Sequence, residues 1–400
     1  MRANPALEAA RHRRNAARVE AERQRPALRP EVNIVGSQLL RGPEVTFPRG
    51  DDLATIEPHS RSRLSVEVEQ PLYQFGAGSA ASSRSKALAA AGEQEFQRAQ
   101  LDLALDVKRA YFELLYTQMA ERVAAQALDL AREQQRITAA LLERERVARL
   151  ELLEAERGVA EAEAALVGAR NGALLARGEL NRLLGRPVGA TLAITPMTNL
   201  PPEPPPTEQL LPEALRERPE AIAMETGIQS AEAGVRLARA ERLPRASLQG
   251  GYDLQTPSAF VPRSSWRVAV EITAPLFETA RIRYNVREAE EQLAALRSEQ
   301  EALAQGIALE IHAARLAMDE AGKRHELALR MEAAAAEAQR LVQLRFELLR
   351  TTPAELAGAR LALSRAQLEG ARAFADVWIA RARLERALGA PLPPQPSAVE

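Results

Sequence analysis

Residues 266–273 read Trp-Arg-Val-Ala-Val-Glu-Ile-Thr, and residues 64–70 read Leu-Ser-Val-Glu-Val-Glu-Gln. In both stretches every second side chain is apolar, and most of the side chains between them are polar or charged. This alternation predicts β-strands in a sheet with one apolar face and one wet face. The apolar set of the first stretch is Trp266, Val268, Val270 and Ile272, and the set facing the other way is Arg267, Ala269, Glu271 and Thr273.

The two stretches belong to a long internal repeat. Pro71-Leu72-Tyr73 matches Pro275-Leu276-Phe277, and the segment Leu180 to Pro187 matches the segment Leu384 to Pro391. Both matches have the same offset of 204 residues, although the landmarks lie more than 100 residues apart within each copy. Self-similarity at a constant offset indicates two copies of one structural unit.

The offset changes near the start of each copy. Asn4-Pro5 corresponds to Arg218-Pro219 at an offset of 214, so the first copy carries about ten extra residues. We place them between Leu40 and Ser62, because this segment is rich in Pro, Gly and Asp and is typical of a loop.

The repeat predicts four parts along the chain. They are a first repeat at 1–189, a Pro-rich linker at 190–212, a second repeat at 213–390 and a Pro-rich tail at 391–400. Each repeat is predicted to contain a helix, a β-hairpin and a long helical hairpin. The β-hairpins are predicted at 31–70 and 246–274, and the helical hairpins at 79–185 and 282–388.

Composition excludes several classes of protein. The chain has 53 basic and 54 acidic residues, and this near-neutral balance offers no argument for nucleic acid as a partner. It contains no Cys, which excludes disulfides and thiolate chemistry. The four histidines lack metal-ligand spacing, so we expect surface histidines, no metal, no cofactor and no enzyme activity. They are His12, His59, His312 and His325. No apolar run approaches the length of a transmembrane helix.

The long helices and the small number of strands together predict an assembly. Each helical stretch that follows a strand pair runs for over 60 residues without Pro, which is typical of a coiled coil. One chain offers only four predicted strands, whereas a closed barrel needs about eight or more. We therefore expect subunits to pool their strands, with charged faces toward water and apolar faces toward lipid.

The motifs resemble those of the TolC family of outer-membrane efflux proteins, over nearly the whole chain. The matching segments are the strand-to-helix elbows Pro71–Gly76 and Pro275–Phe277, Ala110–Leu115, the first tip Val147–Ala155 and the second tip Arg345–Glu347. The resemblance implies a mainly α fold with a small β part: a homotrimer with a twelve-stranded outer-membrane β-barrel and a periplasmic α-helical barrel. It further implies a passive exit duct for efflux or type I secretion, which docks on a periplasmic adaptor (membrane fusion protein) and an inner-membrane pump.

The resemblance also points to residues at the helical tips. It matches the acidic residue that narrows the periplasmic mouth to Glu355, with Glu151 as its counterpart in the first repeat, while Gly358 replaces the next acidic position. In a trimer these carboxylates would form a negative ring that favours cations; the alternative is that both are solvated. The other candidate residues of gate and tip are Arg149, Arg345 and Thr351.

The chain departs from the family pattern in two places. Family members carry a signal peptide, and the second repeat has a helical lead-in at 208–218 that the first repeat lacks. We therefore expect a mis-assigned start or a truncated N-terminus. The family also has Gly at both tip turns, where this chain has Glu145 and Leu349, and Gly eases a tight reversal.

Other interpretations of particular residues remain open. Trp266 is predicted as a membrane-interface anchor, with simple packing on the strand face as the alternative. Gly76-Ala-Gly78 resembles part of a dinucleotide fingerprint, but the second repeat lacks these glycines, so a strand-to-helix bend is favoured. For the whole chain, the alternative is a soluble or periplasmic coiled-coil scaffold or adaptor without a channel.

Overall fold

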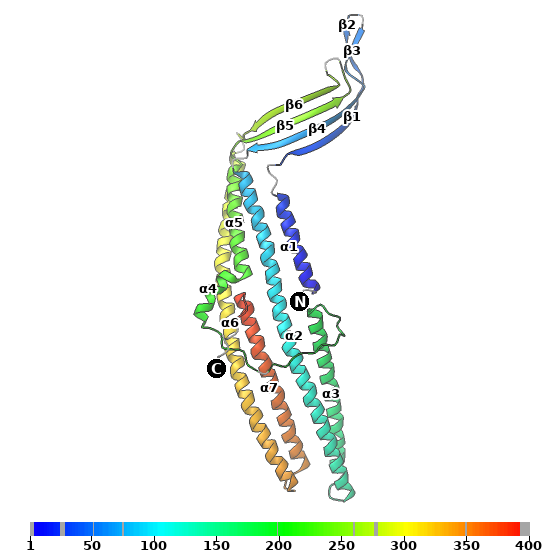
Figure 1. Ribbon diagram of the computed structural model, residues 1–400, viewed down its shortest axis with the longest axis vertical. Helices are drawn as coiled ribbons and strands as arrows, with labels where there is room; N and C mark the ends of the chain where they lie inside the picture. Colours follow the sequence, from blue (N-terminus) through cyan, green and yellow to red (C-terminus); the bar gives the residue numbers. More distant parts are fainter. Residues whose placement is uncertain are drawn as a thin grey trace. The chain divides into compact units, whose positions relative to one another are not determined.

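The structure is a computed structural model of the chain. It describes residues 4–24, 29–50, 52–73, 76–197, 199–258, 261–275, 279–348 and 350–392. The fold is mainly helical with a small sheet, as the sequence predicts (Figure 1). The chain forms two compact units. Unit 1 comprises Met1–Arg13, Gln94–Ile222 and Glu301–Glu400, and unit 2 comprises Arg14–Glu93 and Ala223–Gln300.

Unit 2 contains one four-stranded antiparallel sheet. Its strands are β1 (Glu31–Leu40), β4 (Ser60–Tyr73), β5 (Arg245–Gln255) and β6 (Ser264–Thr273), in the order β1-β4-β5-β6. The two predicted β-hairpins are joined because β4 pairs with β5, with Val66 opposite Tyr252. In the described part of the chain, β1 and β6 are the edges of this sheet.

The prediction of a loop between Leu40 and Ser62 is wrong in part. This segment contains a second, two-stranded sheet made of β2 (Val45–Arg49) and β3 (Asp52–Glu57). Pro, Gly and Asp in this segment indicated a loop, but the segment also contains β-branched and aromatic residues, which favour strands. Pro48 is tolerated because a two-stranded ribbon consists of edge strands only.

The helices of unit 2 pack against one another in pairs. They are α1 (Pro5–Gln24), α5 (Pro219–Ala240) and the adjoining parts of α2 (Ala77–Glu143) and α6 (Thr279–Glu347). The hydroxyl of Ser85 on α2 donates to the carbonyl of Ala21 on α1. Ala238 on α5 packs against Ile282 and Val286 on α6. The first helix of each repeat therefore lies along that repeat's long helix.

Unit 1 contains the two long helical hairpins. The first pairs α2 with α3 (Arg149–Leu183), and the second pairs α6 with α7 (Pro353–Leu388). Buried Leu and Ala side chains join α2 to α3, and a separate cluster joins α6 to α7. Phe112 on α2 packs against Ala375 and Ile379 on α7. The helices therefore form a layer in the order α3-α2-α7-α6 (Figure 1). Among the described residues, no helix combines the length and the apolarity that a membrane span requires.

The predicted linker at 190–212 is extended only in its first part. Helix α4 (Thr207–Glu217) begins inside it, so the boundary of the extended segment lies earlier than predicted. Pro212 lies within this helix. The helix itself agrees with the helical lead-in predicted at 208–218, and Leu210 and Ala214 are buried on one side of it.

Candidate functional site

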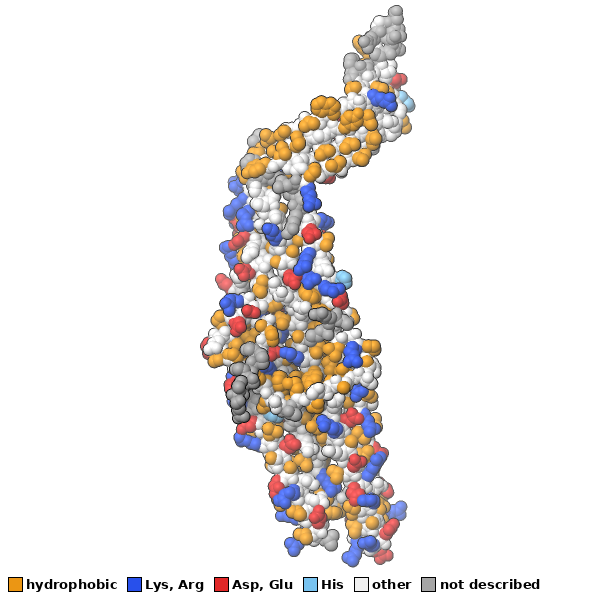
Figure 2. All heavy atoms as spheres, in the orientation of Figure 1, with side chains coloured by type: hydrophobic (Ala, Val, Ile, Leu, Met, Phe, Trp, Pro, Cys, Tyr) orange, Lys and Arg blue, Asp and Glu red, His pale blue; other side chains and the backbone are white. Residues whose placement is uncertain are grey.

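One face of the four-stranded sheet is a continuous apolar surface. Ile34, Val66, Tyr252 and Trp266 form one row across β1, β4, β5 and β6, because each stands opposite the next in the strand register. All four side chains are exposed, and Trp266 is 76% exposed. Figure 2 shows hydrophobic side chains gathered over the sheet. A row this apolar requires a nonpolar environment to cover it.

The opposite face of the sheet carries a network of ion pairs. The guanidinium of Arg267 lies 3.1 Å from the carboxylate of Asp253 and 3.3 Å from that of Glu67. Arg63 approaches the same Asp253 at 2.7 Å. Gly251 makes room for this network, because a Cβ there would lie 3.1 Å from Cζ of Arg267. The sheet thus has one apolar face and one charged face, as the alternation predicts.

The first helical tip reverses through a left-handed residue. The amide of Arg146 donates to the carbonyl of Leu141 at 2.9 Å, and that of Glu145 to Leu142 at 2.9 Å. This pair of bonds is the Schellman motif, whose C′ position is usually Gly. Glu145 occupies that position with φ of 54°. A non-Gly residue therefore takes the conformation for which the family pattern has Gly.

The second tip uses the same kind of bond and adds an N-cap. The amide of Arg350 donates to the carbonyl of Arg345 at 2.9 Å. Leu349, the second departure from the family's glycines, lies outside the described residues. Thr352 caps α7 by accepting the amide of Glu355 at 3.2 Å, and Thr351 donates its hydroxyl to the Glu355 carboxylate. The carboxylate is thus held at the start of the helix, where the helix dipole favours negative charge.

The structure groups the predicted tip residues by hairpin. Arg149 and Glu151 lie in the first turn of α3, and the other three lie at the α6–α7 turn. Both turns lie at the same end of unit 1 (Figure 1). Glu151 is half-buried, and its Oε2 has no hydrogen-bond partner among the described residues. Glu355 is exposed. A Cβ at Gly358 would meet no atom within 4 Å, so this position faces open space.

Sequence reasoning missed a clasp that each repeat forms between its first helix and its return helix. Asn4 caps α1 and donates its amide to the carbonyl of Leu183 at 2.8 Å. At the corresponding place Arg218 donates to the carbonyl of Ala387 at 3.1 Å. Leu183 and Ala387 lie at the ends of α3 and α7, where carbonyls lack partners within the helix. The match of Asn4-Pro5 with Arg218-Pro219 was the signal that could have revealed it.

The second clasp lies in a cluster of charges. Arg218 is buried and lies 2.6 Å from the carboxylate of Glu310 and 3.3 Å from that of Glu220. Arg386 approaches Glu220 at 2.7 Å and also binds Asp102 on α2. Burial raises the pKa of Glu220, but hydrogen bonds from Arg386, the backbone and Arg218 outweigh it and lower the pKa to about 2.

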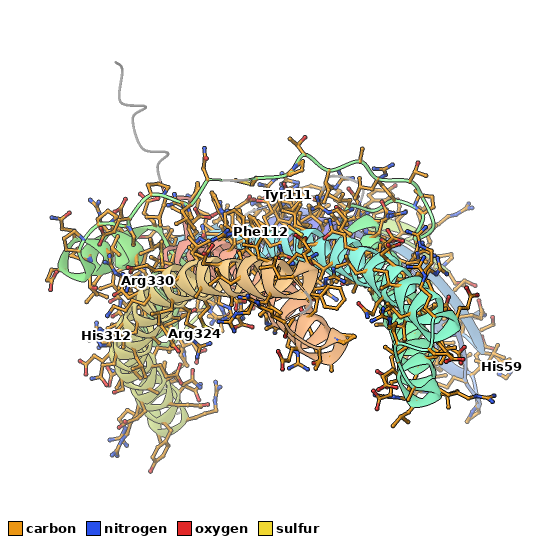
Figure 3. The ribbon with its side chains drawn as sticks, turned by 90° about the horizontal axis from the view of Figure 1, so that it is seen from below. His59, Tyr111, Phe112, His312, Arg324 and Arg330 are labelled. Carbon is orange, nitrogen blue, oxygen red and sulfur yellow. The ribbon has the colours of Figure 1, made fainter. Side chains whose placement is uncertain are left out.

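One prediction about the histidines is wrong. His325 is buried, and its ring packs edge-on against Phe374 on α7, with centroids 5.8 Å apart. Its place among the Ala-rich positions of α6 gave no indication of burial, because helical spacing alone does not tell which face meets a neighbour. His59 and His312 are labelled in Figure 3.

A sheet with one apolar and one ion-paired face, joined to long helical hairpins, defines the class as channel-forming outer-membrane proteins. The sequence matches the family described as "Outer membrane efflux protein" over residues 2–186 and 210–390. The chain belongs to this family. It is an outer-membrane exit duct of an efflux system that extends into the periplasm, and the alternative of a scaffold without a channel is rejected.

Solved structures share the fold. The outer-membrane channel OprN is 23% identical with a TM-score of 0.77, covering 97% of this chain and 87% of that one. VceC from Vibrio cholerae is 17% identical, with a TM-score of 0.79 and coverage of 97% and 93%. The open state of MtrE from Neisseria gonorrhoeae is 22% identical, with a TM-score of 0.78 and coverage of 97% and 87%. A search of curated proteins finds no match.

Proposed function

We propose that three copies of the chain close into one duct, pooling their strands into a twelve-stranded barrel. The observation that carries this proposal is the position of the sheet edges. Strands β1 and β6 are the two edges of the four-stranded sheet in the described part of the chain. Unpaired edges invite pairing with another chain. Pairing of β6 with β1 of the next copy is a head-to-tail contact, which generates a ring when the rotation closes.

The helices of unit 1 support the same closure. The outer helices of the layer are α3 and α6, and each carries an exposed apolar stripe with heptad spacing. The exposed leucines and valine of these stripes are Leu153, Val167 and Leu174 on α3, and Leu327 and Leu341 on α6, with Leu348 directly after the end of α6. Heptad stripes pack in coiled coils. Contact of α3 with α6 of the next copy would cover both stripes and form the helical barrel.

The closure can be tested with paired cysteines, because the chain has no native Cys. Ile34→Cys on β1 is combined either with Val268→Cys or with Val270→Cys on β6, and each double variant is oxidised in isolated outer membranes. Within one sheet β1 and β6 are separated by about 14 Å, too far for a disulfide. Oxidation is expected to produce covalent trimers for at least one pair, while Ile34→Cys alone yields none. If both double variants stay monomeric after oxidation, the proposed closure is wrong.

The tips form the proposed periplasmic mouth and docking end. Glu151 and Glu355 would contribute six carboxylates from three copies, which favours cations. Arg149, Arg345 and Thr351 lie beside them and would shape the contact with a periplasmic adaptor and, through it, an inner-membrane pump. In planar bilayers, Glu151→Gln with Glu355→Gln is expected to lower the preference for K⁺ over Cl⁻. An unchanged ion preference would show that these carboxylates are merely solvated.

The remaining roles follow from the same arrangement. The duct is passive, so it carries out no covalent chemistry and needs no cofactor. Trp266, exposed at the start of β6 on the apolar face, is proposed to anchor the sheet at the membrane interface. The division into two repeats, a linker and a tail is kept as the proposed organisation, with the linker shortened by α4.

A further inference from the structure

A cavity of about 380 Å³ lies in unit 1 between α2, α3, α7 and the linker. Three aromatic rings form one side of it. Phe112 stacks on Trp378 with centroids 5.4 Å apart, and Tyr111 meets Phe112 edge-on at 5.0 Å. Leu180 of α3 and Leu184, directly after the end of α3, also line the cavity. The volume and the apolar lining are typical of sites for small molecules.

The linker forms the remaining wall and is fastened to the helices. Leu192 and Ile194 line the cavity, whereas the residues between and beside them are exposed, so this stretch alternates like a strand. The hydroxyl of Tyr111 donates to the carbonyl of Thr195, and the indole of Trp378 donates to that of Asn199 at 3.2 Å. Figure 3 labels Tyr111 and Phe112 beside the linker. The bonds use the polar atoms of both aromatic side chains and leave their apolar surfaces for the cavity.

Polar groups gather at one end of the cavity. Lys108 and Arg381 both pair with Glu385, so the lining carries two cations and one carboxylate. Arg381 is buried, and it also donates to the carbonyls of Pro202 and Leu392. The side chain of Lys108 is 45% exposed. An ammonium has three donors, and one of them serves Glu385, so the others are available to a ligand.

We propose that this cavity binds a single-chain amphiphile with an anionic head group. The chain lies against the rings of Phe112 and Trp378, and the head group pairs with the ammonium of Lys108. The excess positive charge of the lining selects an anion over a neutral or cationic amphiphile, and the apolar walls select a chain over a free inorganic ion. The competing occupant is a side chain from a second copy, which would leave no room for a ligand.

The test uses the full chain in lipid nanodiscs and decanoate as the probe. The sequence has only two tryptophans, so Trp266→Tyr leaves Trp378 as the sole indole reporter while keeping an aromatic residue at position 266. Decanoate is expected to change the Trp378 fluorescence saturably. Lys108→Met is expected to weaken decanoate binding about tenfold and to leave decan-1-ol binding within twofold. Lys323→Met, an exposed lysine of α6, is the matched control and is expected to change neither.

A second variant tests the location of the chain. Ala382 lines the cavity and is buried, so Ala382→Leu fills the space and is expected to abolish the response to both probes. Ala357→Leu on an exposed part of the same helix is its control, and circular dichroism checks that both fold. The proposal is overturned by an absence of saturable decanoate binding, by equal affinities in Lys108→Met and the parent, or by binding that survives Ala382→Leu.

Discussion

The clasp at Arg218 makes a quantitative prediction about local stability. Arg218→Met keeps most of the side chain's length and removes three contacts, those to Glu310, Glu220 and the carbonyl of Ala387. Glu310 is half-exposed and regains water, and Glu220 keeps Arg386, so these two contribute modestly. The carbonyl of Ala387, which is buried at the end of α7, loses its charged hydrogen-bond donor. Leaving a buried acceptor without its partner costs about 3 kcal/mol at the upper end of the usual range.

A loss of about 3 kcal/mol corresponds to roughly a hundredfold rise in the equilibrium for local opening. Amide hydrogen exchange on the full chain in detergent measures this directly at the start of α5 and the end of α7. We expect exchange there to rise roughly a hundredfold in Arg218→Met, while the exposed Arg216→Met on α4 leaves it unchanged. Exchange within threefold of the parent at both helix ends would refute the idea that Arg218 fastens them.

Three further predictions concern the charge cluster, the first tip and the sheet. The pKa of Glu220 is about 2, below the usual 4.5, so the ionised carboxylate stabilises the fold fully above pH 4.5, and this stabilisation is lost as the pH falls toward 2. The midpoint of thermal unfolding should therefore fall between pH 4.5 and pH 2, and it should fall less in Glu220→Gln. Glu145→Gly should stabilise the first tip by about 1 kcal/mol, because Gly adopts the left-handed conformation without the steric cost of a Cβ. Amide hydrogen exchange in the turn should then be slower, whereas the control Glu143→Gly in the last helical turn should make it faster. Val268→Arg on the apolar face should cost about 2–4 kcal/mol in lipid and deplete the protein from outer membranes, whereas Ala269→Arg on the charged face should be tolerated; equal yields would contradict the assignment of the faces.

The strands and long helices could be predicted because their patterns are regular over many residues. The alternation at 266–273 located β6. The absence of Pro located α2 and α6, which begin within a few residues of the predicted starts of the helical hairpins at 79 and 282. The offset of 204 residues also predicted that each repeat contributes two strands. That β4 pairs with β5 could not be predicted, because both strands alternate in the same way and register depends on their neighbours.

The features that could not be predicted depend on contacts between distant residues. Arg218 lies in a repeat match, but its partner Glu310 is far away in sequence and lies in no matched segment. Lys108 and Glu385 meet only because α2 and α7 are neighbours in the layer. The β2–β3 hairpin was missed for another reason. Its Pro, Gly and Asp residues suggested a loop, while cross-strand pairing allows Pro48 inside a regular strand.

The central claim is that the chain functions as a trimeric duct in the outer membrane. The most direct test is the mass of the particle extracted from outer membranes in mild detergent, measured by light scattering with the detergent contribution subtracted. We predict a protein mass of three times 43.7 kDa. A particle with the mass of a single chain would contradict closure through the β1 and β6 edges and through the α3 and α6 stripes.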